Sequence, residues 1–181
     1  MNETLTIVNE FSGIVANCNN AIGSTLGKTI NFQYGSSSQI LQQLVNVNSS
    51  TLGSLKYPLI GLFQPFKEVR GSVFYCQIKF PKIIIAVGSN ANDSVAQRYT
   101  KSFTPLLYPI YAEFLKQISR WPTVVLENPD YIPHTKLDVP GSAPPSSDDK
   151  KSILRFNDYV DAIHIYDLQL TFQINPNSLR N

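Results

Sequence analysis

Side chains that commonly perform catalysis or bind metals are few in this chain, and they are widely spaced. The sequence contains two histidines, His134 and His164, and two cysteines, Cys18 and Cys76. Neither histidine has a second potential ligand at the spacing of a metal site. The cysteines have neither metal-ligand spacing nor the density of a disulfide framework, so we expect two small buried side chains in a reducing compartment. We expect no metal ion and no other cofactor.

Sequence motifs for nucleotide binding or for an activated nucleophile are also missing. The segment 23–29, Gly-Ser-Thr-Leu-Gly-Lys-Thr, superficially resembles a phosphate-binding loop. Its glycines are one residue closer together than the P-loop motif requires, and no clear strand precedes it. Asp158, Asp161 and Asp167 are neighbours only in sequence, which does not support a general acid–base pair. We predict no catalytic residue and a protein that is not an enzyme.

His134 lies in the Pro-rich arm, which we define as residues 122–152 and which is long for a connection inside a compact domain. We interpret this arm either as a segment that orders against a partner or as a disordered loop, with at least its first half ordered. The residues that we predict at a protein interface are Tyr131, His134, Lys136, Asp148 and Lys150. An alternative is a small hydrolase or ligand-binding domain that uses His134 with a nearby carboxylate. For His164 we expect a strand position that faces solvent or a subunit boundary.

Composition indicates a folded protein that contacts other proteins. The chain has 181 residues, of which 43% are hydrophobic and only 15% are charged. A chain of this length buries roughly 70% of its unfolded surface, and we expect a single domain over residues 1–181. The net charge of +2 is too small to indicate nucleic-acid or membrane binding through electrostatics. No apolar run is long enough to span a membrane, and no signal peptide is evident.

The most informative element is an amphipathic helix predicted between residues 95 and 119. Its apolar residues recur at helical spacing and form a stripe that is wide enough to cover a sheet. They are Phe103, Leu107, Ile110, Phe114 and Ile118. Arg98, Lys101, Glu113 and Lys116 are expected mostly on other faces. Because each proline lacks a backbone donor, Pro105 and Pro109 predict a kink or a broken start at 104–109 and a firm helix over 109–119.

The other elements follow from alternating or helical patterns. We predict helices over 2–16 and 36–47, an edge strand over 28–34, a strand over 57–63 covered on both faces, a turn over 64–71, strands over 72–79 and 82–87, and a last strand over 158–174. In the last strand the apolar residues change parity near Tyr166 and Asp167, which a β-bulge would produce. The expected class is therefore α+β, with a mainly antiparallel sheet of about four strands, the long helix on one face and an N-terminal helix.

This order of elements resembles the tail-terminator and tail-completion proteins of tailed bacteriophages. Three segments carry the resemblance: Tyr57-Pro-Leu-Ile-Gly-Leu-Phe63, Arg98-Tyr-Thr-Lys-Ser-Phe-Thr-Pro-Leu-Leu-Tyr-Pro-Ile-Tyr-Ala-Glu-Phe-Leu115 and Asn157-Asp-Tyr-Val-Asp-Ala-Ile163. They also resemble short proteins of phages and prophages of Bacteroidetes. The resemblance covers residues 55–174, and its motifs are structural rather than catalytic. The insertion over 17–53 and the long Pro-rich arm depart from the family pattern.

The resemblance implies a structural virion protein made in the host bacterial cytoplasm. Members of the family form a homo-oligomeric ring, commonly a hexamer, that ends the tail tube and joins it to the head connector, with DNA passing through the lumen and no sequence-specific contact to it. Another neck or adaptor ring between portal and tail is an alternative, because the departures from the family pattern leave open where in the neck or tail the ring lies. A free-standing host adaptor that binds one protein partner is a further alternative.

Overall fold

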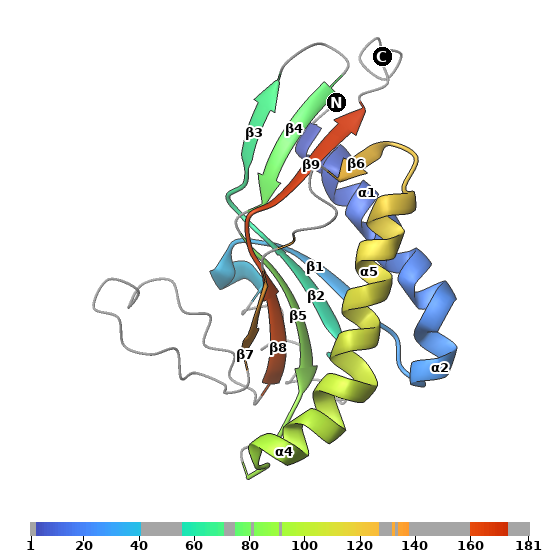
Figure 1. Ribbon diagram of the computed structural model, residues 1–181. Coiled ribbons are helices and arrows are strands. Elements are labelled where there is room, and N and C mark those ends of the chain that lie inside the picture. Colours follow the sequence, from blue (N-terminus) through green and yellow to red (C-terminus); the bar gives the residue numbers. More distant parts are fainter. Residues whose placement is uncertain are drawn as a thin grey trace, which may run out of the picture.

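Two β-sheets stand beside a layer of helices in the computed structural model (Figure 1). The structure describes residues 3–40, 56–70, 75–80, 82–90, 92–126, 132, 134–137 and 160–173. The helical segments are α1 (Glu3–Cys18), η1 (Asn19–Gly23), α2 (Ser24–Leu26), α4 (Val95–Arg98), η3 (Tyr99–Leu107) and α5 (Tyr108–Arg120). The strands are β1 (Asn31–Gly35), β2 (Leu59–Phe63), β3 (Lys67–Arg70), β4 (Tyr75–Phe80), β5 (Ile83–Gly88), β6 (Val124–Leu126), β7 (His134–Leu137), β8 (Val160–Ile165) and β9 (Leu168–Gln173).

The predicted α+β class is confirmed. Sheet A has five strands in the order β1-β2-β5-β8-β7, and sheet B has four in the order β3-β4-β9-β6. Among the described strands only β1 and β2 pair in parallel, so the strands are mainly antiparallel, as predicted. The predicted single sheet of about four strands becomes two sheets, because one long pair of strands passes from one sheet into the other.

That long pair consists of β4 and β5 on one side and β8 and β9 on the other. Phe80 pairs with Leu168 at the end of sheet B, and Ile83 pairs with Ile165 at the start of sheet A. The register is therefore the same on both sides of the junction, with no residue inserted in either strand. Asp167 lies in the junction with a φ of 57°. Asp and Asn adopt this left-handed conformation more readily than most other non-glycine residues.

The buried side chains change parity at this junction. In sheet A the helix-facing core residues include Ile83, Ile85 and Ile165, whereas in sheet B they include Ile78 and Leu170. The predicted parity change near Asp167 is thus confirmed, but the predicted β-bulge is wrong. A bulge adds a residue to one strand only, whereas here both strands change faces together across two positions each.

The long helix is continuous from Val95 to Arg120, so the predicted broken start at 104–109 is wrong. A capping box starts the helix, with Ser94 as its N-cap. The Ser94 hydroxyl accepts a hydrogen bond from the Gln97 backbone amide, and the Gln97 side chain accepts one from the Ser94 backbone amide. The helix changes direction between α4 and α5, which agrees with the predicted kink (Figure 1).

The two prolines are accommodated because the middle of this helix is a π-helix. In η3 the hydrogen bonds span five residues, as in the bond from the Tyr108 amide to the Phe103 carbonyl. Pro105 lies inside η3, and Pro109 lies in the first turn of α5, where a missing donor costs little. The chain therefore stays helical through both prolines while its bonding pattern shifts.

Helices α1 and α5 lie side by side against the sheets (Figure 1). Phe11 of α1 is central to their shared core, with ring centroids 5.0 Å from Phe80, 6.2 Å from Phe114 and 6.4 Å from Phe172. All five predicted core residues of the long helix are buried: Phe103, Leu107, Ile110, Phe114 and Ile118. The expectation for the polar residues is partly wrong, because Arg98 and Glu113 are buried as well.

A glycine sets the distance between α1 and the end of α5. A Cβ atom added at Gly13 would lie 2.6 Å from Cη2 of Trp121. The indole nitrogen of Trp121 donates a hydrogen bond to Glu10, which also accepts one from Thr123. Only glycine lets the ring lie this close to the α1 backbone, and the Glu10 carboxylate holds it there.

The remaining predictions about elements have mixed outcomes. The segment 57–63 is confirmed as a strand covered on both faces, since all five residues of β2 are buried. β1 is confirmed as an edge strand of sheet A. The prediction of a turn over 64–71 is wrong, because β3 occupies half of it. Within the Pro-rich arm, β6 and β7 confirm that part of its first half is ordered, and residues 138–152 lie outside the described residues.

Replacing Phe114 with alanine tests the core. Phe114 is fully buried, so Phe114→Ala is expected to lower the free energy of unfolding by about 3–5 kcal/mol, measured by urea denaturation. The matched control Val95→Ala removes apolar atoms from the same helix at a site that is 63% exposed, and it is expected to change stability by less than about 0.5 kcal/mol. Equal effects of the two substitutions would contradict this assignment of the helix faces.

Candidate functional site

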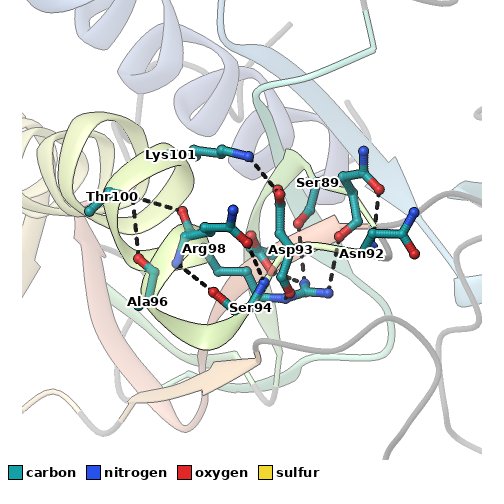
Figure 2. Close-up of polar contacts among 11 residues, drawn as sticks. Ser89, Asn92, Asp93, Ser94, Ala96, Arg98, Thr100 and Lys101 are labelled. Carbon is teal, nitrogen blue, oxygen red and sulfur yellow. Dashed lines mark hydrogen bonds and ion pairs between the residues drawn. The ribbon is translucent and has the colours of Figure 1, made fainter.

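The most extensive polar cluster in the described residues surrounds a buried ion pair (Figure 2). Nη1 of Arg98 lies 2.6 Å from Oδ1 of Asp161. Arg98 is 6% exposed and Asp161 is 0% exposed, so both charges are withdrawn from water. Arg98 comes from the last residue of α4, and Asp161 comes from β8 at the position paired with Val87. The pair therefore ties the start of the long helix to the central strands of sheet A.

The rest of the guanidinium holds the loop that leads from β5 to the helix. Its Nε donates to the Asp93 carbonyl at 3.1 Å, Nη1 donates to the Ser89 hydroxyl at 3.2 Å, and Nη2 donates to the Asn90 carbonyl at 3.2 Å. Outside this buried core, Nζ of Lys101 lies 2.6 Å from Oδ1 of Asp93. One arginine thus fixes loop, helix and strand together.

This geometry supports a positioning role rather than catalysis. Within the described residues, Oδ2 of Asp161 has no hydrogen-bond partner, and the carboxylate is sealed from solvent. An ion pair at this depth is costly to disrupt, because removing one partner leaves the other charge buried and uncompensated. No lining residue of the described hollows belongs to the pair.

The contact between Arg98 and Asp161 was not predicted from the sequence. The available signal was Asp161 itself, a carboxylate within the apolar run of β8, which requires a buried partner. An α-helical period over the whole helix predicted that Arg98 lies on a face away from the core. In the structure Arg98, Ser102, Phe103 and Leu107 are all buried, at spacings of four and five residues that suit the wider turns of η3.

The predicted interface residues are only partly placed by the structure. His134 and Lys136 lie on β7, the edge strand of sheet A, opposite Ile165 and Ile163 of β8. Their side chains lie outside the described part of the chain, as do Tyr131, Asp148 and Lys150. The proposed role of these five residues at an interface, and the alternative role of His134 in a ligand or hydrolase site, therefore stay predictions.

His164 lies on β8, which agrees with the predicted strand position, and it is half-buried; the expectation that it faces solvent or a subunit boundary stays a prediction. It pairs with Ile84 of β5, and among the described residues its Nε2 atom is buried without a hydrogen-bond partner. Burial first, and then the charge of Lys82, lowers the pKa of His164 to about 4. Burial also lowers the pKa of Lys82, whose Nζ lies 5.1 Å from the centroid of the Phe63 ring. The imidazole is therefore neutral at pH 7.

The segment 23–29 has the wrong polarity for a phosphate loop. It ends α2, with Gly27 in the left-handed conformation (φ 62°) that closes a helix, and then leads into β1. A helix end presents carbonyl oxygens, which disfavour anions. A hollow of about 850 Å³ adjoins this turn, lined by Asn19, Gly23, Ser24, Gly27, Lys28, Thr29, Asn31 and Tyr57. The Asn19 side chain is already engaged by both backbone groups of Ile30, at 2.7 and 2.8 Å.

Both cysteines are buried, as predicted, and neither forms a disulfide within the described residues. Burial, followed by the charge of Glu113, raises the pKa of Cys18 to about 12, so this thiol is a poor nucleophile. Hydrogen bonds from Lys116 and Gln117 lower the pKa of Glu113 on the neighbouring helix.

In the described ranges, no three His, Cys, Asp or Glu side chains gather as a metal site would require. No helix in those ranges is long and apolar enough to cross a membrane.

Comparison with known proteins gives no match. Neither a protein-family model, nor a curated protein, nor a solved structure matches this chain.

Removing one charge of the buried pair is expected to destabilise the protein strongly. Asp161→Ala leaves the Arg98 guanidinium buried without its counter-ion, so the free energy of unfolding is expected to fall by about 3–5 kcal/mol. The control is Lys101→Ala, which breaks an ion pair whose lysine side chain is 57% exposed and is expected to cost less than about 1 kcal/mol. Chemical denaturation of both variants measures the difference, and similar losses would show that burial of the pair has no energetic weight.

His164 is expected to make stability fall in mild acid. Its folded-state pKa of about 4 lies below the ordinary value of 6.5, so below about pH 6.5 the unfolded chain takes up a proton that the folded chain does not. Stability from this group is complete above that pH and declines toward pH 4. Between pH 7.5 and 5.0, the wild type is expected to lose ~1 kcal/mol more than His164→Gln, after a discount for the half-buried ring. Parallel pH profiles of unfolding free energy would contradict this.

Proposed function

We propose that this protein is a structural virion component that forms a homo-oligomeric ring at the head–tail junction of a tailed phage. In this role it caps the tail tube and joins it to the head connector. The proposal rests on the resemblance of its element order to tail-terminator proteins and on an α+β fold with a long helix packed against the sheets. Its localisation in the virion and its assembly in the host cytoplasm belong to the same proposal.

The observation that carries the proposal is a pair of unlike edges on sheet B. In the described residues the sheet begins with β3 and ends with β6, so each subunit presents two different strand edges on opposite sides. Closed rings are built from head-to-tail contacts, which need two unlike patches per subunit. Unpaired strand edges are ready templates for pairing with another chain. The fold therefore supplies the kind of contact that a ring requires.

The exposed apolar side chains support the same assignment. Val69 on β3 is 48% exposed, Tyr75 on β4 is 49% exposed, and Val125 on β6 is 49% exposed. They lie on both edges of sheet B and on one of its inner strands. Each edge strand thus has an exposed apolar side chain, Val69 on β3 and Val125 on β6, although β3 also contains charged residues of the kind that protect sheet edges. The low charged fraction of the sequence agrees with a surface that contacts protein.

The ring is tested by the mass of the assembly in solution. Native mass spectrometry and negative-stain electron microscopy of the purified chain are expected to show one closed oligomer, with six copies as the expected number. Val125→Lys places a charge on the β6 edge and is expected to return the protein to monomers without lowering its melting temperature. Val95→Lys is the matched control, because Val95 is also exposed but lies on the helix, and it is expected to leave the oligomer intact.

The alternatives give different results. A monomer at every concentration, together with binding of one host protein, would favour the free-standing adaptor. An oligomer that both lysine variants leave unchanged would place the contact elsewhere than sheet B. Loss of a hydrolytic or ligand-binding activity in His134→Ala would favour the enzyme or ligand-binding alternative.

A further inference from the structure

The exposed face of sheet B is ordered in rows that run across its strands. Val69, Gln77, Thr171 and Val125 are consecutive partners across β3, β4, β9 and β6, so they form one row with valine at each end. Directly opposite residues of antiparallel strands share a face. On the other face, Ile78, Leu170 and their neighbours pack against the helices. The row is therefore on the side of the sheet that the described helices leave uncovered.

The next row, two residues along the strands, is cationic. Lys67 lies directly opposite Lys79, and Lys79 lies opposite Gln169. Like charges placed directly opposite each other repel and destabilise a sheet. Nζ of Lys79 has one ion pair, at 3.2 Å to Asp167, and both side chains of that pair are about half exposed. Among the described residues no ion pair or hydrogen bond compensates Lys67.

A small hollow lies between these two rows. It has a volume of about 110 Å³ and is lined by Lys67, Val69, Gln77, Lys79 and Gln169. Two ammonium groups and two carboxamides surround it, and a valine borders it on the side of the apolar row. A carboxylate fits this environment, since lysine ammonium groups and amide N–H groups donate hydrogen bonds to it.

We propose that this face binds an extended acidic segment of a partner protein, with a carboxylate in the hollow and an apolar side chain against Val69. In an extended chain, residues two apart point to the same side and lie about 6.6 Å apart. That spacing matches the separation of Lys67 and Val69, which are also two residues apart along β3. The segment thus has the pattern acidic–any–apolar. This inference holds independently of the ring, because it names the chemistry of the partner and not the assembly.

The test titrates the full-length protein with each of two synthetic peptides. Binding is monitored by nuclear magnetic resonance, through the chemical shifts of the protein's backbone amides. The acidic probe is acetyl-Thr-Glu-Thr-Val-Thr-Leu-Thr-amide, and the basic probe has lysine in place of glutamate. Saturable shifts are expected at Lys67, Gln77 and Lys79 with the acidic peptide and not with the basic one. Either no shifts with the acidic peptide or equal shifts with both peptides would overturn the proposal.

Charge variants locate the carboxylate. Lys67→Gln is expected to weaken the acidic peptide about two- to fivefold, as loss of an exposed charge contact does. Lys67→Glu with Lys79→Glu is expected to abolish its binding and to permit binding of the basic peptide. Lys28→Glu, an exposed lysine away from sheet B, is the control and is expected to leave both affinities unchanged. If the double variant instead retains the acidic peptide, or changes only self-association, the occupant is not an acidic partner segment.

Discussion

Two strand segments that keep a single register through two sheets are the constraint on which this fold depends. The pairing of 75–88 with 160–173 brings together parts of the chain that are far apart in sequence, and it places β4 and β9 at the centre of sheet B and β5 and β8 near the centre of sheet A. Each remaining strand adds to one side of this pair. Because both strands change faces at the same level, one layer of helices covers sheet B and sheet A with a common core.

The helical layer is fixed to the strands by two kinds of contact. Aromatic rings from α1, α5 and sheet B interlock around Phe11, and this packing is apolar and without direction. The Arg98–Asp161 pair is directional, and it sets the position at which the helix starts relative to β8. Hydrophobic burial therefore stabilises the layer, while the ion pair selects one placement of it among those that similar burial would allow.

Sequence patterns predicted α1, the long helix with its buried face and the α+β class, because those features repeat locally; they did not predict η1 and α2. β3 was not predicted because three of its four residues are charged and only Val69 is apolar, a composition that also fits a turn. The burial of Arg98 was not predicted because an α-helical period was used where the backbone hydrogen bonds of η3 span five residues. The pairing of Arg98 with Asp161 and the cationic row of Lys67 and Lys79 depend on strand register, which a single sequence does not specify. The five predicted interface residues on the Pro-rich arm all lie where the structure describes no side chains.

The shared strand pair also has a mechanical meaning. The covalent backbone runs from sheet B into sheet A twice, in opposite directions, through 80–83 and 165–168. A pull that separates the sheets is carried by two segments of the backbone in parallel and loads the inter-strand hydrogen bonds of β4 with β9 and of β5 with β8 in shear. Bonds that are loaded together in shear resist force better than bonds that open one by one at a strand end, so the two sheets are expected to stay joined under tension.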